Sequence, residues 1–296
     1  MRKKTLWLLY GTWIATGGFL TSCTSDFEGQ FPTENPTPVI NAVLTDDSLI
    51  NVELAWSRPP VSGAADASIS GAIIELREND NLLAPPQEKN PGHYLFQHHA
   101  TAGSTYRIEV EIPGQERLKA ETTIPERVKA VVEKEGNPQG DWVTEHFKLT
   151  TGSLTEKISG LWIIATSYNE DGLPIDQSPG LYCNSPLPDT FNQTYDASLP
   201  NGYVYEYDFF IRIDSKKLIT ENQQLWFAPF SLPKKNDIYI ISASKDYDQY
   251  YKDVWAEKSW DPEIDLPFSY QPVFIHSNIE NGYGIFAGCS IQRFRF

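Results

Sequence analysis

The chain has 296 residues, with 24 lysines and arginines against 39 aspartates and glutamates, and its net charge is −15. A surface this acidic repels phosphate backbones and anionic headgroups, which argues against nucleic-acid binding and against peripheral binding to lipid. The length suffices for one large domain or for two of ordinary size.

The first 23 residues have the pattern of a secretory signal. Three basic residues precede an apolar run that ends at Leu20, and small residues then lead to Cys23. The Leu-Thr-Ser-Cys ending resembles a bacterial lipoprotein box, which implies cleavage after residues 1–22 and lipidation of Cys23. A membrane-spanning anchor is the alternative, but residues 5–20 are shorter than the ~20 residues that a bilayer span needs.

Removal of this signal makes the chain more acidic. The first 22 residues carry three positive charges and no negative ones, so the net charge of −15 becomes −18. Asp26 and Glu28 follow Cys23 closely, an arrangement that resembles the signal for display on the outer face of the outer membrane. Residues 23–38 are polar and proline-containing, and they are predicted to form an extended tether.

Period-two alternation begins near Val39. Residues 50–56 and 106–112 alternate apolar with polar side chains, which is typical of half-buried strands. Further strands are predicted at residues 72–77, 94–98 and 118–123, with turn residues between them. Several short strands spaced by turns predict an immunoglobulin-like β-sandwich over residues 39–125.

A second β-rich domain is predicted over residues 126–296. Its expected strands are residues 128–133, 145–151, 161–168, 203–213, 238–242, 273–277 and 285–291, with a hairpin turn at residues 280–282. Residues 169–201 show no clear periodicity and are expected to form a long surface loop that is functional or ordered.

One amphipathic helix is predicted at residues 245–258 of this second domain. Apolar side chains recur there at helical spacing, in Tyr247, Tyr250, Tyr251, Val254 and Trp255. Ser244 is placed to cap its first turn. The fold class is therefore mostly β, with one amphipathic helix on the second part.

The sequence contains no motif that fixes a reaction, and no catalytic residue or cofactor is predicted. The adjacent His98 and His99 would point to opposite faces of a strand, so no metal site is expected there. Asp246, Asp248 and Asp253 are expected to lie on a solvated helix face.

Two cysteines remain beyond the signal, Cys183 and Cys289. An exported chain meets an oxidising compartment, so a disulfide between them is one alternative. The other is that both are buried free thiols.

Tyr203, Tyr205 and Tyr207 fall on one face of the predicted strand at residues 203–213. They could form a stacking platform for a sugar ring or a peptide, because tyrosines offer rigid amphipathic contact area. Alternatively, the same side chains pack in the core.

Motifs near the C-terminus indicate a family. Ser277-Asn-Ile-Glu-Asn281-Gly-Tyr-Gly284-Ile-Phe-Ala-Gly288 is similar to a motif of the Bacteroidetes lipoprotein family described as domain of unknown function 4249. Ser242-Ala-Ser-Lys-Asp-Tyr247 and Gly71-Ala-Ile-Ile-Glu-Leu76 resemble two further segments of it. The resemblance implies a lipidated, mostly β protein that accompanies TonB-dependent outer-membrane receptors. It implies no catalytic residue and no ligand.

The sequence thus leads to a principal hypothesis and two alternatives. The principal one is a non-catalytic, surface-exposed outer-membrane lipoprotein, held by its lipid anchor, that assists a TonB-dependent transporter by docking on the barrel or by binding ligand. The first alternative is a carbohydrate- or peptide-active enzyme with an unrecognised carboxylate site. The second is a structural protein of the cell envelope.

Overall fold

The computed structural model describes residues 35–58, 67–135, 145–152, 154–175, 180–194, 205–218, 222–229, 235–259 and 273–296. The signal, Cys23 and most of the predicted tether lie outside these residues. Residues from Pro36 to Phe296 form one compact unit. None of the helices in the described ranges is long and apolar enough to span a membrane.

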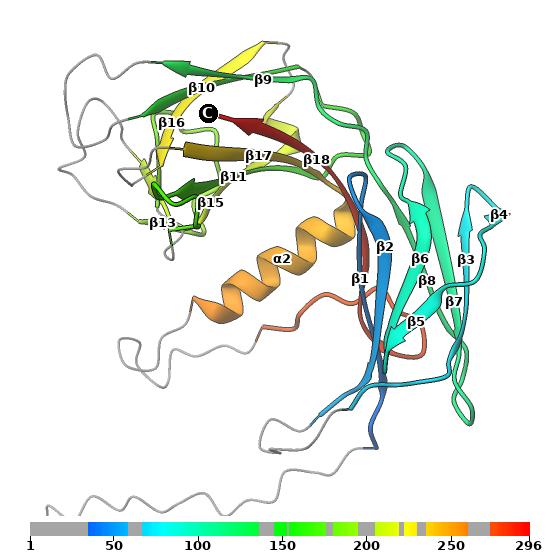
Figure 1. Ribbon diagram of the computed structural model, residues 1–296. Coiled ribbons are helices and arrows are strands. Elements are labelled where there is room, and N and C mark those ends of the chain that lie inside the picture. Colours follow the sequence, from blue (N-terminus) through cyan, green and yellow to red (C-terminus); the bar gives the residue numbers. More distant parts are fainter. Residues whose placement is uncertain are drawn as a thin grey trace, which may run out of the picture. The chain divides into compact units, whose positions relative to one another are not determined.

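The described elements confirm a mostly β fold, with strands in three sheets and one described α-helix, α2 (Figure 1). The eight-stranded sheet has the order β15 (Phe210–Asp214), β11 (Gly160–Tyr168), β17 (Lys235–Ala243), β18 (Tyr283–Arg295), β1 (Pro38–Thr45), β2 (Leu49–Trp56), β6 (His93–His99) and β5 (Gln87–Asn90). The four-stranded sheet has the order β4 (Asn81–Leu82), β3 (Ile73–Glu78), β7 (Thr105–Glu111) and β8 (Leu118–Thr123). The six-stranded sheet has the order β13 (Gln193–Thr194), β14 (Tyr205–Tyr207), β12 (Leu181–Cys183), β16 (Gln223–Pro229), β10 (His146–Thr151) and β9 (Ala130–Glu135).

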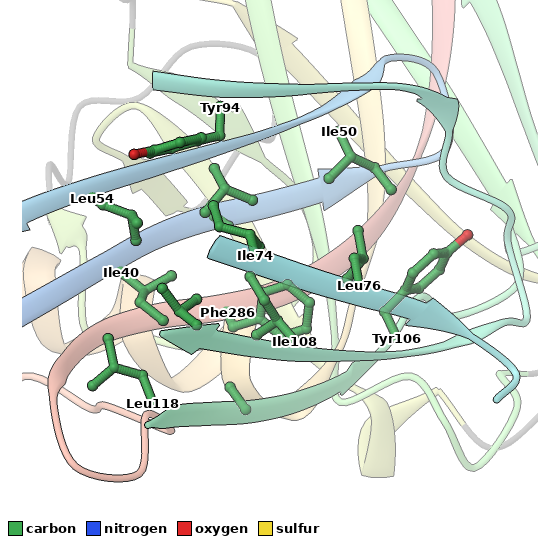
Figure 2. Close-up of a cluster of buried hydrophobic side chains, with 14 of the residues drawn as sticks. Ile40, Ile50, Leu54, Ile74, Leu76, Tyr94, Tyr106, Ile108, Leu118 and Phe286 are labelled. Carbon is green, nitrogen blue, oxygen red and sulfur yellow. The ribbon is translucent and has the colours of Figure 1, made fainter. Parts of the chain in front are cut away.

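The N-terminal strands bury alternate side chains, as their sequence pattern predicts. Ile40 of β1 and Leu54 of β2 face Leu76 of β3 and Ile108 of β7 in one core between two sheets (Figure 2). This is a sandwich-like arrangement, and its immunoglobulin-like type stays a prediction.

The C-terminal strand β18 joins both halves of the chain. Its first part pairs in parallel with β1, and its second part pairs antiparallel with β17. Phe286 of β18 therefore lies in the N-terminal core (Figure 2), whereas Phe294 packs against a second core. The eight-stranded sheet consequently runs across the predicted boundary at residue 125, and the division into two domains stays a prediction.

The close pairing of β1 with β18 depends on Gly284. Its φ of +102° is accessible to glycine, and a Cβ there would overlap the main-chain carbonyl of Ile40. Asn281 turns the chain just before this strand with a φ of +62°. The turn expected at residues 280–282 is present, but it leads into a parallel pair and not into a hairpin.

The second core lies between the six-stranded sheet and the β11–β15–β17 end of the eight-stranded sheet. The expectation of a long loop over residues 169–201 is wrong for β12, whose three residues are all buried in the six-stranded sheet. A strand of three residues is too short to produce a recognisable alternation.

The single strand predicted at residues 203–213 is also wrong. Among its described residues, β14 belongs to the six-stranded sheet and β15 to the eight-stranded sheet. The chain changes sheets at Asp208 and Phe209, where Phe209 has a φ of +62°. Nothing in the alternating sequence signals this break.

The helix α2 spans Lys245–Lys258, as predicted, and Ser244 caps it by accepting a hydrogen bond from the Tyr247 N–H. Tyr247, Tyr251 and Trp255 pack against the eight-stranded sheet. The predicted strand at residues 273–277 is not formed. That segment runs along α2 instead, where Asp253 accepts a hydrogen bond from the His276 N–H at 2.9 Å.

Candidate binding surface beside the helix

The structure favours core packing over a stacking platform for Tyr207, one of the three tyrosines predicted on one strand face. Tyr203 lies outside the described residues, Tyr205 is half-buried and Tyr207 is 1% exposed within the second core. Burial raises the pKa of Tyr207. Tyr207 therefore has a packing role and offers no ring face to a ligand.

The structure contains no disulfide between Cys183 and Cys289, because both are free thiols in separate apolar clusters. Burial raises the pKa of Cys183 to about 11 and also raises the pKa of Cys289. Such thiols are protonated and poorly reactive.

An exposed aromatic cluster lies at the corner where the chain changes sheets. Phe209 is 48% exposed and Phe191 is 39% exposed, although both are large apolar side chains. The rings of Phe209 and Phe210 each contact Trp255 of α2 edge-on, with centroids 5.2 Å apart. The ring of Phe191 lies 5.8 Å from that of Phe210. We call Phe191, Phe209, Phe210 and Trp255 the aromatic patch.

The backbone that presents Phe209 is strained. The Phe210 N–H donates to the Asp208 carbonyl at 2.7 Å, which closes a γ-turn around Phe209 with positive φ. This form of the γ-turn is rare, and a bulky residue in it costs about 1–3 kcal/mol. A glycine would avoid that cost.

The side chain of Asn192 stabilises this turn by hydrogen bonds. Its side-chain amide donates to the carbonyls of Asp208 and Phe210, both at 2.7 Å, and the residue itself is buried. The strained conformation is thus fixed by hydrogen bonds on both sides of Phe209. The arrangement supplies a rigid apolar surface and no reactive group.

A buried ion pair supports the helix beside the patch. Asp248, expected on a solvated face, is only 2% exposed and accepts hydrogen bonds from Arg212 Nε at 2.9 Å and Nη2 at 2.6 Å. Trp162 Nε1 also donates to Asp248 Oδ1 at 2.9 Å. Gly160 leaves room for the pair, since a Cβ there would lie 2.5 Å from Asp248 Oδ1.

Asp189 also pairs with the Arg212 guanidinium and links it to a further charge. Burial alone lowers the pKa of Arg212, but Asp248 and Asp189 together hold it above its usual value. Asp189 pairs with Arg212 and with Lys217, whose Nζ lies 2.9 Å from Asp189 Oδ1. Arg212, Asp248, Asp189 and Lys217 thus pair with one another. The pair of Arg212 with Asp248 fixes α2 on the sheet.

Two histidines of the described chain pair closely with carboxylates. His98 Nε2 lies 2.9 Å from Glu78 Oε2, and His276 Nε2 lies 2.8 Å from Asp246 Oδ1. In the part of the chain that the structure describes, no three histidine, cysteine, aspartate or glutamate residues are grouped so that they could hold a metal ion.

Comparison with protein families gives one match, to the family described as "Domain of unknown function (DUF4249)", over residues 24–295. The chain belongs to this family. The match covers all described elements of this DUF4249 protein, including the strained turn and α2. None of the curated proteins matches the chain.

Three solved structures resemble the chain distantly. A glycoside hydrolase family 2 β-glucuronidase is 10% identical with a TM-score of 0.22, over 85% of this chain, which spans only 22% of the enzyme's length. The yeast δ-COP-I μ-homology domain bound to a Dsl1 peptide is 10% identical, with a TM-score of 0.21 over 87% of this chain and 94% of that domain. The collagen-binding domain of the Erysipelothrix rhusiopathiae surface protein RspB is 10% identical. Its TM-score is 0.19, and the likeness covers 87% of this chain and 97% of that domain. These scores are too low to support a shared fold or function.

Proposed function

We propose that this protein is a non-catalytic lipoprotein of the outer membrane, displayed on the cell surface, that serves a TonB-dependent transporter as a docking or ligand-binding partner. The observation that carries the binding role is the aromatic patch. Exposed apolar surfaces of this kind mark interaction sites, and aromatic residues supply much of the energy of protein interfaces. The strain at Phe209 is compensated if the ring contributes to binding.

The anchoring role rests on the N-terminal sequence. The signal-like residues end at Cys23, and the family match begins at residue 24. Two or more acyl chains on one cysteine give stable membrane attachment, since each buried CH₂ contributes about 0.8 kcal/mol. The transporter role is the one that the family resemblance implies.

Co-purification in mild detergent tests the proposal. A tagged wild-type protein is expected to retain a barrel with a plug domain, identified by mass spectrometry. Phe209→Gly is expected to reduce the recovered barrel at least tenfold, whereas Phe274→Ser, at an exposed phenylalanine outside the patch, leaves it unchanged. Recovery of wild-type protein with no barrel would refute the transporter role. If Phe209→Gly recovers as much of the barrel as the wild-type protein does, the aromatic patch is excluded as the docking surface.

A further inference from the structure

A cleft that shares no residue with the aromatic patch lies at the open edge of the six-stranded sheet. It has a volume of about 710 Å³, and residues of β9, β10 and β18 line it. This volume lies within the ~300–1,000 Å³ that is typical of small-molecule sites. The buried side chains of Val128 and Ile158 contribute apolar surface to it.

Three hydrogen-bonding oxygens, two on residues that line this cleft and one on a residue next to it, are buried and have no partner in the part of the chain that the structure describes. Thr151 lines the cleft and is 2% exposed, and its Oγ1 makes no hydrogen bond. Gln292 donates from Nε2 to the Val128 carbonyl at 2.6 Å, which fixes its amide and leaves Oε1 without a donor. Gln223 is not itself a lining residue, but it follows the lining Asn222 and lies opposite Thr151 in the pair of β10 with β16, and its Oε1 also lacks a donor among the described residues. Buried oxygens of this kind call for a hydrogen-bonding partner, which must be a donor for the two glutamine oxygens.

The charges that line the cleft are nearly balanced. Arg127 Nε lies 2.5 Å from Asp46 Oδ2, and the charge of Lys129 is offset by the lining carboxylate of Glu126. A strongly charged ligand would therefore gain little from these side chains, and the two amide oxygens of Gln223 and Gln292 can only accept hydrogen bonds. The ligand that fits is neutral, carries several hydrogen-bond donors and has some apolar surface.

The spacing of the acceptors separates two neutral ligand classes. Thr151 and Gln223 are directly opposite in an antiparallel pair, so their side chains start about 5 Å apart. Hydroxyls on neighbouring carbons of a sugar ring are close enough to reach both. Peptide N–H groups on one edge of a strand recur only every ~7 Å and pair best with main-chain carbonyls.

We propose that this cleft binds a neutral carbohydrate unit. Hydroxyl groups donate to Thr151, Gln223 and Gln292, and the apolar face of the ring packs on Val128 and Ile158. The proposal goes beyond the function given above, because it requires neither the lipid anchor nor a transporter.

Calorimetric titration of the full-length protein in detergent tests this site. The probes are disaccharides and trisaccharides of glucose, galactose, mannose and N-acetylglucosamine. At least one is expected to bind, and Thr151→Val is expected to raise its Kd at least tenfold. That variant should melt at or above the wild-type temperature, because it removes an unpaired buried hydroxyl. Gln223→Leu provides a second test and should also raise Kd at least tenfold.

Thr122→Val is the matched control. Thr122 is similarly buried, its hydroxyl has no partner among the described residues, and it does not line the cleft. It should leave Kd unchanged, as should Phe209→Gly in the aromatic patch. The absence of binding by every sugar at millimolar concentration would overturn the proposal. So would binding of an extended Ala-Ser octapeptide that protects the amides of Ala130 and Val132 from hydrogen exchange, since that result assigns the edge of β9 to a peptide.

Discussion

Arg212 of β15 and Asp248 of α2 form an ion pair in which each residue is only 2% exposed. The pair joins the helix to the eight-stranded sheet beside the aromatic patch, and Trp162 and Ser159 donate further hydrogen bonds to the carboxylate. Removing one partner of a buried ion pair leaves an uncompensated charge in the interior, which costs about 3–5 kcal/mol.

Asp248→Asn is therefore expected to lower the free energy of unfolding by about 3 kcal/mol, because Arg212 keeps its charge and loses its buried carboxylate partner. Urea denaturation followed by circular dichroism measures this difference. Asp253→Asn on the same helix is the control and should cost less than about 1 kcal/mol, since its amide oxygen can still accept the His276 N–H.

The double variant Arg212→Met with Asp248→Leu should recover most of the loss. Well-packed apolar residues often replace a buried ion pair without net cost. An Asp248→Asn protein as stable as the wild type would show that the pair does not hold the helix.

Phe209→Gly is expected to leave the free energy of unfolding unchanged or to raise it by about 1 kcal/mol, despite the loss of a large side chain. The reason is that glycine removes the backbone strain at positive φ, while the ring is half exposed and buries little area. Thermal or urea unfolding provides the measurement. A loss of 2 kcal/mol or more would mean that the ring is needed for folding and would weaken its assignment to binding.

The sequence predicts some elements well because their signals are local. The helix α2 has both an apolar stripe and a capping serine, and β2 and β7 have strict alternation. Asp248 was also predictable in principle, because it lies three residues before Tyr251 and seven before Trp255, on the packed face of the helix. Its partner, Arg212, is distant in the sequence, so no local pattern distinguishes this carboxylate from a solvated one.

Other features depend on contacts between distant segments. The pairing of β1 with β18 joins residues more than two hundred positions apart, and no local pattern specifies it. Phe209 occupies a turn without a glycine, asparagine or aspartate at the positive φ, so the usual turn signal is missing. The candidate binding surface therefore emerges only from the folded chain.

Two glycine substitutions separate steric overlap from backbone strain. Gly284→Ala is expected to destabilise the protein by about 3 kcal/mol or more, because the new methyl group overlaps the Ile40 carbonyl and a φ of +102° is strained for alanine. Gly114→Ala has a positive φ but no atom within 4 Å of its Cβ, so it should cost about 1–2 kcal/mol. Chemical denaturation measures both. Equal costs would show that the β1–β18 contact tolerates a methyl group.

The stability contributed by Glu78 depends on pH. Burial raises the pKa of Glu78, but hydrogen bonds from Tyr106, Ser104 and Thr101 and the charge of His98 lower it more, to below its usual 4.5. A folded-state pKa that is lowered stabilises the protein above the unfolded pKa, and the contribution is lost as the pH falls through the folded pKa.

Tyr106→Phe removes the hydroxyl that donates to Glu78 Oε1 at 2.8 Å. It should lower the free energy of unfolding by about 1–2 kcal/mol at pH 7, and the difference from wild type should shrink below pH 4 as Glu78 becomes protonated. Urea unfolding between pH 3 and pH 7 measures both effects. If the difference in unfolding free energy between Tyr106→Phe and the wild type stays constant over this range, the Tyr106 hydroxyl does not act on the ionised form of Glu78.

Lipid attachment at Cys23 is the central claim, and mass spectrometry of the N-terminal peptide from the outer-membrane fraction tests it most directly. The wild-type peptide is expected to begin at Cys23 and to carry acyl chains. Cys23→Ser should lose both the acylation and the retention in this fraction, whereas Cys183→Ala should keep both. A Cys23→Ser protein that is still acylated, or that is still processed and held in the outer-membrane fraction, would contradict the account.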